Sequence, residues 1–423
     1  MISKSYGEFS RSIHQRFAGR REALEVSIEV TRRCPLGCLH CYNNLPMADR
    51  AARERELTTA EHFRLLDECS DLGCLWLLYT GGEIFARHDF LEIYTYAKQK
   101  GFLITLFTNG TLIHERIADH LAEWPPFVVE ITLYGRTRET YEAMTGVAGS
   151  HAHCLRGIQL LRERGVPLKL KTVSTRINRH EISAMRRFAE EELGVEFKFD
   201  SLVNPRIDCS QNPLAIRLQP EEVVALDFAW PNMVREYRVM AEREMAQPVA
   251  EEAEPGVYVC GGGMSSFAVN PYGQMSVCLL SQQETRDFRP EGVKAVWEGF
   301  LAKVREKKRT RPSKCVRCRL QSLCGMCPAN GELENGDPET PVTFLCQVAH
   351  LRARALGLEV PEHGACECCP GGEHHAALCA SAERIRVGEV DVEGWAPPPP
   401  VLPVLNNSPV TAGGCGCGAH AHD

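Results

Sequence analysis

The chain has 423 residues, 44% of them hydrophobic and 24% charged, which is the composition of a globular protein with ample material for a core. Its 48 lysines and arginines and 55 aspartates and glutamates leave a formal net charge of -7, which argues against a protein that mainly coats nucleic acid or an anionic membrane. No apolar run approaches the ~18 residues of a membrane span, and the N-terminal stretch lacks an apolar signal segment, so we expect a cytoplasmic protein with neither a membrane nor a nucleic acid as partner.

Strand and helix patterns alternate six times between residues 23 and 205, after a polar lead-in at residues 1–22. The expected strands cover residues 23–31, 75–80, 102–108, 128–134, 168–175 and 196–203. The helices between them cover residues 61–73, 89–101, 114–124, 154–165 and 181–194. Short strands joined by crossover helices imply a parallel sheet. Because six units are too few for a closed eight-fold barrel, we predict an α/β fold over residues 23–205 with an open, partial (βα)6 barrel and function at the carboxyl ends of its strands.

The pattern changes after this barrel. Residues 206–256 predict a helical linker, in which a helix begins at Pro220 and an acidic stretch with prolines follows at 247–256. Residues 257–350 are rich in cysteine. Residues 351–423 form a low-complexity tail rich in cysteine, histidine and proline, which we expect to be flexible.

Cysteine is the unusual residue of this composition, with 20 copies that gather in tight clusters. Clustered thiols in a reducing compartment point to metal rather than to disulfides. After the first strand come Cys34, Cys38 and Cys41, spaced C-x3-C-x2-C. Four thiolates usually close an iron–sulfur cubane, so three hold three corners and leave one iron open for catalysis. The alternative is a structural zinc site with His40 as fourth ligand, although its place between two cysteines makes that geometry difficult.

This motif, with its position after the first strand, resembles the signature of the radical S-adenosylmethionine (radical SAM) superfamily. The resemblance implies a [4Fe-4S] cluster on the catalytic ligands Cys34, Cys38 and Cys41, whose unique iron chelates the amino and carboxylate groups of S-adenosylmethionine (SAM). Reduction then cleaves SAM to methionine and a 5′-deoxyadenosyl radical. The family residue before the third cysteine is usually aromatic and lies near adenine. Here it is His40, and Tyr42 after Cys41 is a further candidate contact to SAM.

Segments after the next strands carry further candidate SAM ligands. Gly81, Gly82 and Glu83 follow the second strand, where glycines let a backbone approach a ligand and a carboxylate can pair with an ammonium group. The family's GGE segment binds the methionine amino group, and the alternative is a plain strand-to-helix turn. Asn109 follows the third strand in a segment that resembles the family's TNG, although Asn-Gly is also a common turn.

The later strands supply three more candidates for the same ligand. Thr132 ends the fourth strand, where relatives often carry a serine near the SAM ribose or carboxylate. Lys171 and Ser174 belong to the fifth strand and have the alternative of being ordinary solvated strand positions.

Seven cysteines lie in residues 257–350, where little apolar periodicity exists to build a core, so we expect metal ligation to supply folding energy. Paired C-x2-C units suit zinc or iron–sulfur clusters. The pattern resembles the SPASM domain, a C-terminal extension of many radical SAM peptide-modifying enzymes, and implies a small domain with two auxiliary [4Fe-4S] clusters. The implied ligands are Cys260, Cys278 and Cys327 for the first cluster, and Cys315, Cys318, Cys324 and Cys346 for the second.

This chain departs from the family spacing at one point. Two residues, rather than three, precede Cys327, and the first ligand set lacks one protein ligand. A ribbon with two zinc ions is the alternative. In the tail, four more cysteines and two histidines are candidates for a further metal, as is the cysteine- and histidine-rich end of the chain, but we favour a disordered tail that takes up metal adventitiously. These tail residues are Cys366, Cys368, Cys369, Cys379, His374 and His375.

The resemblance covers about residues 23–350 and is closest to the group with the pyrroloquinoline-quinone peptide cyclase, sactipeptide maturases and anaerobic sulfatase maturases. It implies an oxidoreductase-type peptide maturase that modifies a ribosomally made peptide by hydrogen abstraction, forming a thioether, a carbon–carbon bond or an oxidised side chain. An auxiliary cluster nearby would accept the product radical's electron or ligate the substrate. One alternative is a radical SAM enzyme that acts on a small molecule in cofactor biosynthesis. Another is a non-catalytic iron–sulfur electron carrier or zinc-binding module.

Two protein partners are expected besides the peptide substrate. One is an external electron donor of the flavodoxin or ferredoxin type. The other is a separate small protein that recognises a leader peptide, because the ~22 residues before the first strand are too few to fold a recognition domain.

Overall fold

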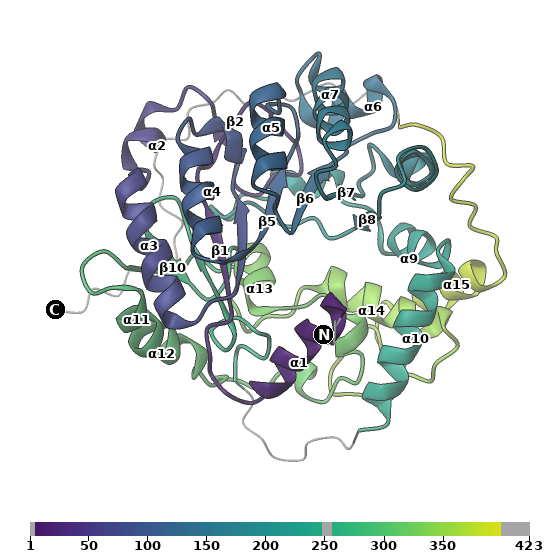
Figure 1. Ribbon diagram of the computed structural model, residues 1–423. Coiled ribbons are helices and arrows are strands. Elements are labelled where there is room, and N and C mark those ends of the chain that lie inside the picture. Colours follow the sequence, from purple (N-terminus) through teal and green to yellow (C-terminus); the bar gives the residue numbers. More distant parts are fainter. Residues whose placement is uncertain (1–4, 248–255, 399–423) are drawn as a thin grey trace.

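One large mixed sheet forms the centre of the protein (Figure 1). The structure is a computed structural model that describes residues 5–247 and 256–398. The strands are β1 (Glu25–Glu29), β2 (Arg33–Cys34), β3 (Leu45–Pro46), β4 (Trp76–Thr80), β5 (Leu103–Thr108), β6 (Val128–Thr132), β7 (Leu168–Val173), β8 (Phe197–Asp200), β9 (Ser266–Val269), β10 (Gln274–Ser276) and β11 (Arg286–Asp287). Nine of them form the large sheet in the order β11-β10-β9-β1-β4-β5-β6-β7-β8, and β2 and β3 pair separately.

The helices before the cysteine-rich region are α1 (Tyr6–Arg16), α2 (Arg50–Arg55), α3 (Thr59–Leu72), α4 (Phe90–Gln99), α5 (Glu115–Glu123), α6 (Arg138–Thr145), α7 (Ser150–Glu163), α8 (Ile182–Arg187), α9 (Pro220–Phe228) and α10 (Pro231–Met245). After it begins come α11 (Val293–Ala295), α12 (Ala302–Arg305), α13 (Pro328–Asn335), α14 (Thr343–Ala355) and α15 (His375–Arg386). Within the described residues, none of these helices is long and apolar enough to cross a membrane.

The six predicted strands are all present and run in parallel from β1 through β4 to β8, so the expected partial barrel is confirmed. Helices α3, α4, α5 and α7 lie along one side of these strands (Figure 1). Alternating apolar side chains face them: Tyr79 of β4 and its partner Leu106 of β5 are fully buried, and the Tyr79 ring lies 5.2 Å from that of Phe90 in α4. This layer of apolar contacts holds the carboxyl ends of the strands in a fixed arc.

The other face of the strands is polar. Glu130 of β6 lies 3.3 Å from Nζ of Lys171 on β7 and 3.8 Å from Nζ of Lys198 on β8. Lys171 also lies over the Phe107 ring of β5. The inner face of the barrel therefore offers charged and hydrogen-bonding groups rather than a second apolar layer.

The cysteine-rich region contributes directly to the large sheet, which the sequence did not indicate. β9 pairs in parallel with β1, with Phe267 opposite Val26, and β10 and β11 continue antiparallel beyond it. Phe267 and Trp297 pack together with both side chains buried. The two regions therefore share one sheet and one core.

The N-terminal lead-in contains a helix. A capping box joins the Ser5 and Glu8 side chains to the first turn of α1. The helix rests against the amino ends of the barrel strands, where Nε1 of Trp76, the first residue of β4, donates a hydrogen bond to the Tyr6 hydroxyl at 3.0 Å.

Part of the C-terminal segment is also folded, in contrast to the flexible tail that its composition suggested. Helix α15 packs against α14 and α9, and three of the tail cysteines, Cys366, Cys368 and Cys369, are buried. The last two cysteines of the chain, Cys415 and Cys417, lie outside the described residues.

Candidate active site

The loop after β1 brings Cys34, Cys38 and Cys41 together at the carboxyl end of the sheet. Burial raises the pKa of Cys34 to about 12. Burial also raises the pKa of Cys38 well above its usual range, and the neighbouring Cys41 and Cys34 thiols raise it further, so the three sulfurs face one another. Two buried thiols and the partly buried thiol of Cys41 are the soft donor set that an iron–sulfur cluster requires.

These three sulfurs do not form one of the compact ligand groups found among the described residues. Within residues 5–247 and 256–398, the groups of metal-ligating atoms that lie within 4.8 Å of one another are all in the C-terminal region. The three thiols of this loop are therefore farther apart than the ligands of one zinc ion.

Neighbouring segments hold the cysteine loop in place. Nδ2 of Asn109, after β5, donates to Sγ of Cys34 at 3.5 Å. Arg206, after β8, donates to the Cys41 carbonyl at 3.1 Å and to the Asn44 carbonyl at 2.9 Å. Because contacts from the middle and from the last strand of the barrel converge on this loop, its sulfurs are positioned before any cofactor binds.

His40 and Tyr42 flank Cys41, and their side chains contact different parts of the barrel. Burial lowers the pKa of His40 to about 4, so its ring is neutral, and its Nδ1 has no hydrogen-bond partner among the described residues. The ring lies 5.1 Å from that of Tyr134, after β6. The Tyr42 hydroxyl donates to Glu29 of β1 at 3.2 Å.

The two glycines after β4 pack against the start of the cysteine loop. A Cβ on Gly81, where φ is 144°, would lie 2.1 Å from the Thr31 carbonyl oxygen, and one on Gly82 would lie 2.4 Å from that of Arg32. Only glycine permits this approach. The close backbone contact that we expected with a ligand is thus made with the chain itself, which places Glu83 beside the cysteine loop.

Glu83 is a buried carboxylate, 1% exposed, at the centre of the candidate site. It accepts hydrogen bonds from the Thr108 hydroxyl at 2.7 Å and from the Asn109 backbone N–H at 2.9 Å. Burial nevertheless raises its pKa to about 7. A carboxylate in this position gains from a cationic ligand, because a positive charge would favour its ionised form.

The remaining candidates occupy the inner ends of β6 and β7. Thr132 is half-buried at the end of β6. Lys171 already has an acidic partner in Glu130, and burial lowers its pKa to about 8. Ser174 is fully buried, and its Oγ has no hydrogen-bond partner among the described residues. The orphaned Ser174 hydroxyl and His40 nitrogen are polar atoms that a bound cofactor could satisfy.

Both expected groups of auxiliary ligands are partly assembled. Burial raises the pKa of Cys278 to about 11, and the neighbouring Cys327 and Cys260 thiols raise it further, so these three lie together. In the second group, Cys315, Cys318 and Cys324 line one cavity of about 220 Å³. Cys327 lines this cavity too, and thus lies between the two groups.

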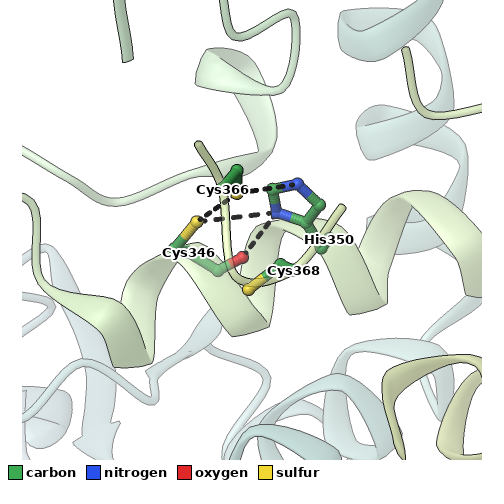
Figure 2. A group of neighbouring side chains, drawn as sticks. All are labelled: Cys346, His350, Cys366 and Cys368. Carbon is green, nitrogen blue, oxygen red and sulfur yellow. Dashed lines mark hydrogen bonds between the residues drawn. The ribbon is translucent and has the colours of Figure 1, made fainter. Parts of the chain in front are cut away.

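Cys346, the last expected ligand of the second group, lies among side chains that do not belong to the SPASM-like motif (Figure 2). Its Sγ is 3.7 Å from Sγ of Cys366 and 3.7 Å from Nδ1 of His350. His350, one turn beyond Cys346 on α14, and His363 were not among the candidates. The only sequence signals were that one-turn spacing and the C-x2-C spacing of Cys366 and Cys369.

Known proteins share this sequence pattern and fold. Residues 28–189 match the family model of the radical SAM superfamily. The PqqA peptide cyclase of Bradyrhizobium diazoefficiens is 31% identical over 269 residues, which cover 62% of this chain and 68% of that protein. The chain belongs to the radical SAM superfamily. An AdoMet-dependent heme synthase of Methanosarcina barkeri is 25% identical over 328 residues, 74% of this chain and 93% of that protein.

Solved radical SAM structures have the same fold. Streptococcus suis SuiB, bound to its precursor peptide SuiA, matches with a TM-score of 0.60 and 18% identity over 80% of each chain. The structure of anSMEcpe with bound AdoMet matches with a TM-score of 0.59 and 16% identity over 86% of this chain and 100% of that chain. The expected order of a radical SAM partial barrel followed by a cysteine-rich, SPASM-type region is confirmed. As a member of this superfamily, the protein belongs to enzymes that use a [4Fe-4S] cluster and SAM.

Proposed function

We propose that this radical SAM enzyme modifies a ribosomally made peptide by hydrogen abstraction. The observation that carries the proposal is the convergence of three neighbouring thiols with the buried Glu83 carboxylate at the carboxyl ends of β1, β4 and β5. The similarity to PqqA peptide cyclases, which extends beyond the barrel, supports a peptide as the substrate. The same fold in SuiB bound to its precursor peptide is consistent with this choice.

Different residues of the candidate site bind the cluster and the different parts of SAM in this proposal. Cys34, Cys38 and Cys41 would hold the [4Fe-4S] cluster, which supplies the electron that cleaves SAM when both are bound. Glu83 accepts hydrogen bonds from the amino group of the methionine part, because its carboxylate is buried beside the cysteine loop. The neutral His40 ring packs beside adenine.

Other groups at the carboxyl ends of the strands bind the rest of SAM in this proposal. The unpaired Ser174 hydroxyl is suited to a polar atom of the ribose or carboxylate. Tyr42, Asn109, Thr132 and Lys171 complete the wall around it, with Asn109 also holding Cys34 in place.

Two auxiliary [4Fe-4S] clusters in residues 256–350 would accept the electron left on the substrate after hydrogen abstraction. The first is held by Cys260, Cys278 and Cys327, which lie together. The second is held by Cys346 and the three cavity-lining thiols, Cys315, Cys318 and Cys324. An external donor of the flavodoxin or ferredoxin type reduces the catalytic cluster, and a separate small protein presents the leader of the peptide.

A small-molecule substrate is the second candidate. It is supported by the AdoMet-dependent heme synthases, whose similarity covers 74% of this chain and 93% of the Methanosarcina barkeri protein. In this case the inner face of the barrel would bind an iron porphyrin rather than an extended peptide.

One experiment separates the two candidates. Anaerobic enzyme, with SAM and dithionite, is incubated in parallel with the short peptides encoded beside its gene and with an iron porphyrin. We expect 5′-deoxyadenosine release together with a peptide that has lost hydrogen, as mass spectrometry would show. Conversion of the porphyrin with unchanged peptides would support the second candidate, and an absence of 5′-deoxyadenosine would refute both.

The role of Glu83 is tested by SAM affinity. The Glu83→Gln variant keeps the shape and the burial of the side chain but cannot carry charge, so we expect the Kd for SAM to rise by roughly 10- to 100-fold. Glu139→Gln on the exposed side of α6 is the matched control and should leave the Kd unchanged. Equal affinities for wild type and Glu83→Gln would remove Glu83 from the SAM site.

A further inference from the structure

Two histidines and two cysteines from separate segments converge between α14 and α15. His350 belongs to α14, whereas His363, Cys366 and Cys369 belong to the loop that follows it. Their ligand atoms all lie within 4.8 Å of one another, and all four side chains are buried, with exposures of 0 to 6%. Thiols and imidazoles gathered away from water at this distance form a potential metal site.

Hydrogen bonds to the backbone orient both imidazoles toward the centre of this group. Nδ1 of His350 lies 2.9 Å from the Cys346 carbonyl oxygen, as Figure 2 shows, and Nδ1 of His363 lies 2.9 Å from the Pro361 carbonyl oxygen. A carbonyl only accepts, so each Nδ1 carries the hydrogen and each Nε2 keeps a free lone pair. Metal-binding histidines are held in this way, with one nitrogen donating to the backbone and the other on the metal.

The distances around the group match a single tetrahedral ion. Nε2 of His350 lies 3.7 Å from Sγ of Cys366 and 3.6 Å from Sγ of Cys369. The same Cys369 sulfur lies 3.6 Å from Nδ1 and 4.0 Å from Nε2 of His363. Bonds of ~2.3 Å to sulfur and ~2.0 Å to nitrogen at tetrahedral angles place neighbouring ligand atoms ~3.5 Å apart. A cubane cluster holds each thiolate on a different iron and would need wider spacing.

We propose that His350, His363, Cys366 and Cys369 form a closed, mononuclear zinc site. Two thiolates and two imidazoles, with no open position, are the ligand set of a structural zinc ion, and the C-x2-C spacing of the two cysteines is typical of one. Binding releases two thiol protons and fastens the loop at 363–369 to α14. The site thereby fixes the helix that carries Cys346 and the position of α15 beyond it.

A second group, which shares His350 and Cys366 with the first, includes Cys346 and Cys368. In that group the Cys346 sulfur lies 3.7 Å from Nδ1 of His350. The hydrogen of this Nδ1 is directed to the backbone. We assign the zinc to the group in which Nε2 of His350 faces both sulfurs, those of Cys366 and Cys369, and leave Cys346 and Cys368 out of the site. Cys346 remains available for the auxiliary cluster of the proposed function, on which the zinc site does not depend.

Metal analysis and X-ray absorption of the anaerobically purified full chain test this proposal without any variant. We expect about one zinc per chain beside the iron, and a zinc-edge spectrum with two sulfurs at ~2.3 Å and two nitrogens at ~2.0 Å. Iron without stoichiometric zinc would overturn the proposal. So would three or more sulfur ligands on the zinc, or a disulfide between Cys346 and Cys366 detected by peptide mapping.

Two neighbouring buried cysteines provide a matched pair of variants. Cys369→Ala should lose the zinc and keep the iron of the wild type, whereas Cys368→Ala should keep both metals. Zinc retained by Cys369→Ala, or lost equally from both variants, would contradict the ligand set. Loss of about four irons from Cys369→Ala would instead assign this thiol to an iron–sulfur cluster and overturn the proposal. These readouts remain informative even if the enzyme acts on a small molecule.

Discussion

The barrel and the cysteine-rich region share a sheet but reach their folds by different physical means. In the barrel, consecutive strands bury large apolar side chains against long helices, as Ile28, Tyr79 and Leu106 illustrate, all of them fully buried. Beyond residue 256, the strands have two to four residues and α11 and α12 have three and four. Elements this short contribute little apolar burial of their own.

Groups of thiols accompany the apolar side chains that the second region adds to the shared core. Cys278 lies beside the Cys327 and Cys260 thiols. Cys324 lies beside the Cys318 and Cys315 thiols and also packs against a small apolar cluster, and burial raises the pKa of Cys324 to about 12. Metal ligation exchanges thiol protons for strong bonds and can supply folding energy where a core is small. The comparison therefore indicates a barrel that is stable without metal and a C-terminal region that is not.

The largest difference between the two regions is expected when Cys34, Cys38 and Cys41 are all replaced by alanine. SAM cleavage under dithionite should fall to background, because these three cysteines hold the cluster beside Glu83, where SAM binds in the proposed function. Iron should fall from roughly twelve to roughly eight per chain, as Mössbauer spectra and iron analysis would show. The far-UV circular dichroism should stay unchanged. Loss of all the iron would mean that the two regions do not fold independently.

Removal of iron from the wild-type enzyme should have the next largest effect. After treatment with an iron chelator, we expect amides in residues 256–350 to lose their protection from hydrogen exchange, while those of β4, β5 and β6 stay protected. The strand β9 is the informative boundary, because it pairs with β1 yet belongs to the cysteine-rich region. Equal loss of protection in both regions would contradict the comparison.

Local patterns predicted the parts of the molecule that depend on local sequence. The six parallel strands follow from short apolar runs that alternate with helical patterns. The cysteine loop follows from three cysteines within eight positions. Glu83 was predicted from the glycines before it. What these glycines contact, the backbone at Thr31 and Arg32, became visible only in three dimensions.

Contacts between distant segments could not be predicted in the same way. Nothing in the run Ser266–Val269 specifies that it pairs with β1, which lies some 240 residues earlier. His350 and His363 belong to no local motif, and their relation to Cys366 and Cys369 depends on how the loop folds back onto α14. The cysteines of this loop were noticed, but composition indicated a flexible tail because low complexity hides such tertiary contacts.

A buried ion pair provides a third test, at the junction between the linker and the C-terminal region. Nε of Arg352 on α14 lies 2.7 Å from Oδ2 of Asp227 on α9, which is 2% exposed. Arg352→Ala leaves this carboxylate buried without its partner and should lower the free energy of unfolding by about 3 to 5 kcal/mol. Arg384→Ala removes the exposed pair of α15 with Glu221 of α9 and should cost less than about 1 kcal/mol. Urea unfolding measures both, and similar losses would show that the Arg352 pair is effectively solvated.

The smallest expected change in stability concerns the barrel core, where a polar side chain lies within the apolar layer. His62 on α3 is fully buried, both its ring nitrogens have no hydrogen-bond partner among the described residues, and burial lowers its pKa to about 3. The unfolded chain, in which the pKa is about 6.5, therefore binds more protons below that pH, and stability falls as pH falls. Between pH 7 and pH 5.5 the wild type should lose about 1 kcal/mol more than His62→Leu, as paired urea titrations would show. A parallel pH dependence of the two proteins would mean that water or another group reaches this ring, and that the barrel core is less dry than its apolar neighbours imply.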